Sequence, residues 1–106
     1  MTEPLFSLRA QRELRAAAEW IAADNPQAAR GLVRAAMRAA ALLRRRPQLG
    51  ARRLNWAPER YRFWPLRGFP YLIVYDVDAQ PPHVVRFVHT ARDLPAVLGE
   101  GDGLPE

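Results

Sequence analysis

The 106-residue sequence contains no cysteine and no lysine. Without cysteine, the chain has no disulfide, no thiolate zinc site and no cysteine nucleophile. Without lysine, it has no Schiff-base former and no amine to act as a general base. All 16 basic residues are arginines, which stay protonated. A chain without cysteine suits a reducing compartment, so we expect a cytoplasmic protein.

Long apolar runs are missing as well. No stretch approaches the roughly 20 apolar residues that a membrane-spanning helix needs. The first residues lack the basic and apolar regions of a secretory signal peptide. A chain of this length forms one domain with a modest core. We expect this domain at residues 1–98, followed by an acidic, glycine-rich tail at 99–106 that is disordered.

The positive charge is concentrated in the first half of the chain. Residues 9–53 hold 11 arginines against three acids, whereas the rest of the chain holds 5 arginines against 8 acids. A basic half of this kind suits an acidic partner, either nucleic acid or an acidic protein segment. A solvated helix face explains the same charges equally well, so charge alone leaves both interpretations open.

Apolar residues at helical spacing predict two consecutive helices, over 10–24 and over 26–45. Between them, Asn25 is a good N-cap and Pro26 suits the first position of the second helix. The many alanines allow the two helices to pack closely as an antiparallel hairpin. Three arginines recur at every fourth residue on one face of the second helix, namely Arg30, Arg34 and Arg38.

The remaining segments have the composition of strands. We expect a first strand at 4–8 and two strands on either side of a turn at RGFP, the second of them covering 71–77. Pro65 lies inside the strand before that turn, which indicates an edge or a bulge there. The last strand is expected at 83–89. This order predicts an α+β fold, in which the helical hairpin covers an antiparallel sheet of about four strands and a short C-terminal helix follows.

The stretch VRFVHTARDLP, residues 85–95, holds a histidine, two arginines and an aspartate, so it is a candidate active site. Asp93 is better explained as the N-cap of a short helix with Pro95 at its second position. His89 suits proton transfer near neutral pH, but a lone histidine at a strand end is more often structural. His83 lies about 20 Å away along the strand and no third ligand stands at metal spacing, so we predict no metal site.

Arg86 lies in the middle of the last predicted strand. If its neighbours Val85 and Phe87 face the helices, Arg86 points to the opposite, open face of the sheet. Arg62 and Arg67 come from the neighbouring part of the sheet, and aromatic side chains interleave with them. Such a cluster suits phosphates, the carboxylates of a bound peptide, or plain solvation of the sheet.

Four stretches occur in an order and spacing typical of one family: AEWIAADNPQAARGLV (18–33), RRPQLG (45–50), YRFWPLRGFPYLIVYDVD (61–78) and VVRFVHTARDLPAVL (84–98). Together they resemble the RelE/ParE superfamily of toxins from bacterial type II toxin–antitoxin systems, and most closely its ParE branch. The resemblance implies a helical hairpin packed on a curved antiparallel sheet of about four strands, with no cofactor.

The ParE-like resemblance also implies two partners. The target would be DNA gyrase, inhibited by protein–protein contact, and the neutralising partner a ParD-like antitoxin. Such an antitoxin has a ribbon–helix–helix part, through which DNA is met indirectly, and an acidic amphipathic C-terminal segment. We expect that segment to contact the basic and aromatic residues Arg30, Arg34, Arg38, Arg62, Arg67, Tyr71 and Arg86. The expected target contacts are His89, Arg92, Leu94, Val97 and Leu98.

The RelE branch supplies the alternative, a ribosome-dependent mRNA endoribonuclease. RelE-like toxins rely on lysines in the middle of the chain, which are absent here, and no tyrosine follows the last strand. An arginine–histidine mechanism remains open, with His89 as acid or base and with Arg62 and Arg86 stabilising the phosphorane. A third possibility is a degenerate toxin that binds its antitoxin and poisons nothing.

Overall fold

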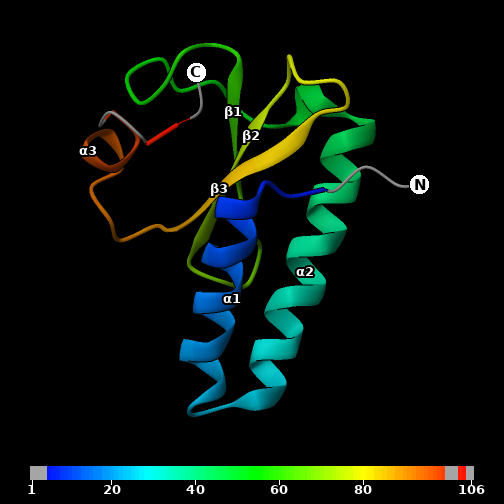
Figure 1. Ribbon diagram of the computed structural model, residues 1–106, viewed down its shortest axis with the longest axis vertical. Coiled ribbons are helices and arrows are strands. Elements are labelled where there is room, and N and C mark those ends of the chain that lie inside the picture. Colours follow the sequence, from blue (N-terminus) through cyan, green and yellow to red (C-terminus); the bar gives the residue numbers. More distant parts are fainter. Residues whose placement is uncertain (1–4, 100–102, 105–106) are drawn as a thin grey trace.

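The computed structural model describes residues 5–99 and 103–104. Two long helices are followed by a three-stranded antiparallel sheet and a short C-terminal helix. Figure 1 shows the long helices α1 and α2 running side by side, with the sheet at one end of the pair and α3 away from them. The α+β class and the helical hairpin are therefore confirmed, whereas the sheet has three strands within the described residues rather than about four.

The strand predicted at 4–8 is wrong as far as the structure describes it, from residue 5 onward. Phe6 forms only an isolated parallel bridge with Val84. Helix α1 (Leu8–Ala22) begins immediately afterwards, because the Ser7 hydroxyl accepts a hydrogen bond from the Ala10 N–H at 3.1 Å and caps the helix. The cap starts the helix too early for a strand to form in front of it.

Helix α2 (Pro26–Arg45) has the predicted bounds. Asn25 caps it by accepting a hydrogen bond from the Ala28 N–H at 3.0 Å. A short 3₁₀ turn, η1 (Pro47–Leu49), follows, because proline cannot continue the α-helical hydrogen bonds. The two helices pack with alanines between them, which brings their backbones close together.

The sheet has the order β1 (Tyr61–Pro65), β2 (Tyr71–Asp76) and β3 (His83–His89). Pro65 ends an edge strand, as its missing N–H requires. The turn between β1 and β2 contains Gly68 at a φ of 86°, which glycine adopts without strain.

The sheet separates two apolar cores. One lies between the sheet and the long helices and includes alternate residues of β2, namely Tyr71, Ile73 and Tyr75. The other lies on the opposite face and includes Leu72 and Val74 of β2. Successive side chains of β2 therefore enter the two cores in turn, and both faces of the strand are buried.

Helix α3 (Leu94–Gly99) covers part of the second core with Leu94 and Leu98. Asp93 precedes it and accepts a hydrogen bond from the Ala96 N–H at 3.4 Å, so the predicted cap is confirmed. Of the predicted tail beyond this helix, Leu104 packs against the second core, and residues 100–102 and 105–106 lie outside the described residues. Within the described part of the chain, no helix has the length and apolar character to cross a membrane.

Candidate functional site

A groove of about 970 Å³ runs between the two long helices. Each helix contributes residues four positions apart, which form a straight row along one helix face. The row on α1 is Leu14, Ala18 and Ala22, and the row on α2 is Ala29, Val33 and Met37. Most of these side chains are small, so an occupant can approach the helix backbones closely.

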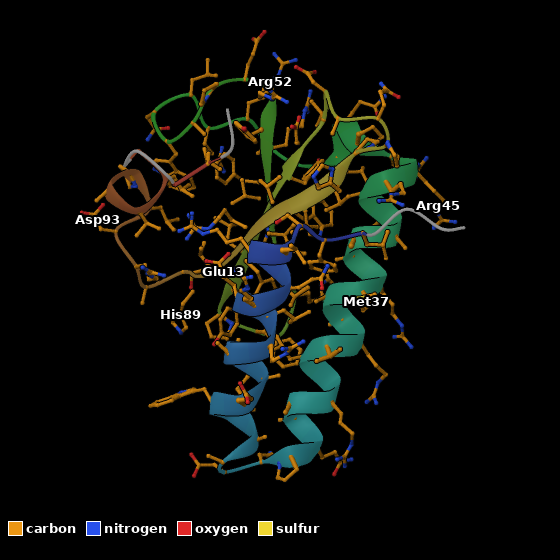
Figure 2. The ribbon with its side chains drawn as sticks, viewed as in Figure 1. Glu13, Met37, Arg45, Arg52, His89 and Asp93 are labelled. Carbon is orange, nitrogen blue, oxygen red and sulfur yellow. The ribbon has the colours of Figure 1, made fainter. Side chains whose placement is uncertain are left out.

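The groove leaves large apolar side chains of α2 exposed. Val33 is 37% exposed and Met37 is 42% exposed, and both lie on α2 beside the apolar row of α1. Met37 points outward from the middle of α2 in Figure 2. Contiguous apolar surface of this kind, framed by charged residues, is typical of a protein interaction site.

The rim of the groove is basic. Arg15 of α1 and Arg30 and Arg34 of α2 line it, against the single carboxylate of Glu19. Arg38 is exposed on α2 and does not line the groove. Two of the three arginines expected on the second helix, Arg30 and Arg34, therefore lie beside an apolar floor. An acidic amphipathic helix complements this surface in both charge and polarity.

Arg86 is buried, whereas the sequence predicted an open position for it. It is 2% exposed and forms a buried ion pair with Glu13 of α1. Its Nε lies 3.0 Å from both carboxylate oxygens of Glu13, its Nη2 lies 2.8 Å from Oε2, and its Nη1 donates to the Gly103 carbonyl. Figure 2 shows Glu13 at the end of α1 nearest the sheet. The expectation that Arg86 lies on an open face is wrong, and the side chain offers no free guanidinium to a partner.

Arg86 lies on the face opposite the long helices, as expected, because it pairs with Val74 of the second core. That face is not open at this point, since the Gly103 carbonyl accepts a hydrogen bond from Arg86. A β-bulge changes the position of the neighbouring Val85 instead. Between Val74 and Tyr75 the register shifts, so that Tyr75 pairs with Val84 and Val74 pairs with Arg86. Val85 is the extra residue, and the strict alternation assumed for β3 fails there. No pattern in the sequence predicts this bulge.

The three residues of the nuclease alternative are not brought together. Cross-strand partners share a face, so Arg62 lies on the face of its partner Tyr75, and Arg86 lies on the face of Val74. His89 pairs with Tyr71, four residues from Tyr75 along β2, and lies two strands away from Arg62, which together places it roughly 16 Å from the position of Arg62. One phosphate cannot contact all three side chains in this arrangement.

Arg62 and Tyr71 also have structural contacts of their own. Arg62 is half-buried, and its Nη1 donates to the carbonyls of Gln48 and Gly50 at 3.0 Å each. Tyr71 is buried and its ring stacks on Phe87 with centroids 5.0 Å apart. Among the residues of the sheet and its turns that were expected to meet a partner, only Arg67, in the turn after β1, is exposed.

His89 is bound into the end of β3. Its Nδ1 accepts a hydrogen bond from the Ala91 N–H at 3.0 Å, and its ring packs edge-on against Tyr71. Figure 2 shows the histidine at the outer end of its strand. No group of three or more metal-ligating side chains occurs among the described residues.

The surface expected to meet the target is only partly exposed. Arg92 is exposed and Val97 is half-buried, whereas Leu94 and Leu98 are buried and hold α3 on the sheet. Leu14, Val33 and Met37 were not predicted from the sequence as site residues. Their signal was present, since apolar residues at helical spacing continue beyond the face that the hairpin buries.

The comparisons with known proteins agree with the fold. A family model described as the ParE toxin of the type II toxin–antitoxin system parDE matches residues 5–94. No curated protein matches the chain. A solved chain from the chromosomal ParDE toxin–antitoxin system of P. aeruginosa has a TM-score of 0.68 and 19% identity, covering 79% of this chain and 90% of that chain. The chain therefore belongs to the ParE toxin family of type II toxin–antitoxin systems.

Proposed function

We propose that this ParE-family toxin binds a ParD-like antitoxin through the groove between α1 and α2. The observation that supports the proposal is the groove of about 970 Å³, which has an apolar floor and is lined at its rim by Arg15, Arg30 and Arg34. An acidic amphipathic helix buries its apolar face on such a floor and places its carboxylates beside the guanidinium groups. A ribbon–helix–helix part of the same antitoxin would provide the contact with DNA.

We further propose that the target is DNA gyrase, inhibited in the cytoplasm by protein–protein contact rather than by catalysis. Support comes from family membership and from the separation of Arg62, Arg86 and His89, which removes the cluster that a nuclease mechanism needs. Arg86 in particular is occupied by Glu13.

The antitoxin site is tested by calorimetric titration with the antitoxin encoded beside the toxin gene. Met37→Asp places a carboxylate on the apolar floor, and we expect it to weaken binding more than tenfold, or about 1.4 kcal/mol. Leu54→Asp is the matched control, because Leu54 is 69% exposed and lies outside the groove. Equal effects of the two substitutions would place the antitoxin elsewhere.

The target is tested by a gyrase supercoiling assay with the purified toxin. We expect inhibition that an equimolar amount of antitoxin reverses. His89→Ala should retain this inhibition, because His89 makes structural contacts at the strand end. If saturating toxin leaves supercoiling unchanged, gyrase is not the target, and cleavage of ribosome-bound mRNA is then measured with His89→Ala as the control.

A further inference from the structure

A second groove lies on the face of the sheet that the long helices do not cover. Its volume is about 520 Å³. Phe63 and Leu72 of the sheet and Leu94 of α3 are the buried residues that line it. Pro65 and Pro95 are exposed at its sides. Volumes of this size are typical of pockets that enclose one or two large groups.

Two exposed arginines stand at this second groove. They are Arg53, from the loop before β1, and Arg92, from the turn before α3. Among the described residues, neither forms an ion pair with a carboxylate. The one acid lining the groove, Asp93, accepts a hydrogen bond from the first turn of α3. The groove therefore combines an apolar floor with two unpaired cations, which is the complement of an acidic segment carrying a large apolar side chain.

The contacts of Trp56 favour a peptide over a nucleic-acid strand as the molecule that binds in the second groove. Its ring meets Phe63 edge to face at 5.3 Å between centroids, and the Arg53 guanidinium lies over it at 5.8 Å. A single-stranded nucleic acid binds by stacking its bases on open aromatic faces. Here the indole is already in contact with Phe63 and with Arg53. A phosphodiester backbone also leaves the floor of Phe63 and Leu72 without an apolar partner.

We propose that this second groove binds an extended acidic peptide segment of a partner protein. One large apolar side chain of the segment packs on Phe63 and Leu72, and flanking carboxylates bind Arg53 and Arg92. The groove lies across the sheet from the groove between α1 and α2, since the two are lined by the two different cores. The toxin thus has two separate peptide sites, and this one stands whether or not gyrase is the target.

The test uses fluorescein-labelled peptides with two aspartates on each side of a central residue, which is Phe, Leu or Ala. Binding to the full chain is measured by fluorescence anisotropy. The Phe and Leu peptides are expected to bind at least tenfold more tightly than the Ala peptide, because only they fill the apolar floor. In ¹⁵N-resolved NMR spectra, the indole signal of Trp56 should shift while that of Trp20, which is exposed on α1, stays in place.

The charged contacts are tested with Arg53→Gln/Arg92→Gln, which should weaken the Phe peptide about tenfold. Arg45→Gln/Arg46→Gln is the matched control, because it removes the same charge from exposed residues at the end of α2. The control should bind as the unchanged chain does, and both variants should keep the same melting temperature. Equal weakening by both double variants would reduce the effect to net charge and overturn the proposal.

Three further results would also overturn it. These are no binding of any peptide at millimolar concentration, equal binding of the Phe and Ala peptides, and tighter binding of a hexauridylate RNA with the Trp56 signal shifted. The last of these would assign the groove to nucleic acid instead.

Discussion

Replacing Glu13 with glutamine should destabilise this protein by about 3 kcal/mol or more, because it leaves the Arg86 charge buried without a carboxylate. The magnitude follows from the burial of the pair. The Arg86 side chain is 2% exposed and cannot be hydrated, whereas that of Glu13 is 18% exposed and keeps some contact with water. Removing the arginine should therefore cost less than removing the acid. We expect Arg86→Met to cost about 1–2 kcal/mol.

The structural role of the pair explains why so much depends on it. Besides binding Arg86, the Glu13 carboxylate accepts a hydrogen bond from the backbone N–H of Phe87 at 2.9 Å. This N–H lies on the outer edge of β3, where no further strand of the described residues accepts it. One carboxylate thus joins α1 to both the side chains and the backbone of β3.

Urea unfolding at pH 7, followed by circular dichroism, measures the effect. A domain of this kind has a total stability of roughly 5–15 kcal/mol, so a loss of about 3 kcal/mol is easily detected. The double variant Glu13→Gln/Arg86→Met should lose about 2 kcal/mol less stability than the two single variants lose in sum. Glu19→Gln, at an exposed position of α1, should change stability by less than about 0.5 kcal/mol. Strict additivity, or a loss below about 1 kcal/mol for Glu13→Gln, would refute this account of the pair.

Three other predictions concern single contacts. Gly50→Ala should cost about 1–3 kcal/mol in thermal melts, because an added Cβ would lie 2.6 Å from the Tyr75 ring carbon Cε1. A melting temperature unchanged by this substitution would show that the ring moves freely. Burial raises the pKa of Tyr61 and of Tyr75 above the usual 10.0, so the unfolded chain loses these protons at a lower pH than the folded chain. The contribution of these two tyrosines to the free energy of unfolding should be constant below about pH 10 and should fall as the pH rises further. Tyr75→Phe should reduce that fall, as measured by urea titrations at about pH 8 and 10.5. Finally, Asn25→Ala should cost about 1 kcal/mol in the same assay, because it removes the cap of α2, while Asn55→Ala in an exposed loop should cost almost nothing.

Local signals in the sequence were sufficient for most of the elements. The cap at Asn25 and the proline after it located the start of α2 correctly, and Asp93 located the start of α3. Alternation along 71–77 identified a strand whose two faces enter two different cores. These predictions succeeded because capping, turn formation and alternation depend on neighbouring residues. The prediction of a strand at 4–8 was wrong for a local reason, because the Ser7 cap starts helix α1 among these apolar residues.

The candidate sites were less predictable. The arginines of α2 were recognised, but the groove beside them consists of residues from two helices, and its open state depends on how those helices pack. The second groove combines Arg53 and Trp56, which lie three residues apart, with Arg92 from much later in the chain, and these residues meet only when α3 folds over the sheet. Spacing along the chain carries no information about such a meeting.

The sequence by itself determined the class of fold, the helix caps, the absence of thiol and amine chemistry, and membership of the toxin superfamily. These properties reside in composition and in short-range patterns. The tertiary structure alone decided the role of Arg86. A bulge in β3 places Val85 on the same face as Arg86, and Arg86 keeps the face opposite the long helices because it pairs with Val74. The guanidinium that the alternating pattern assigned to an open face is buried because Glu13, a residue 73 positions earlier in the chain, and the Gly103 carbonyl both bind it. Contacts between segments so distant in the chain leave no local pattern in the sequence.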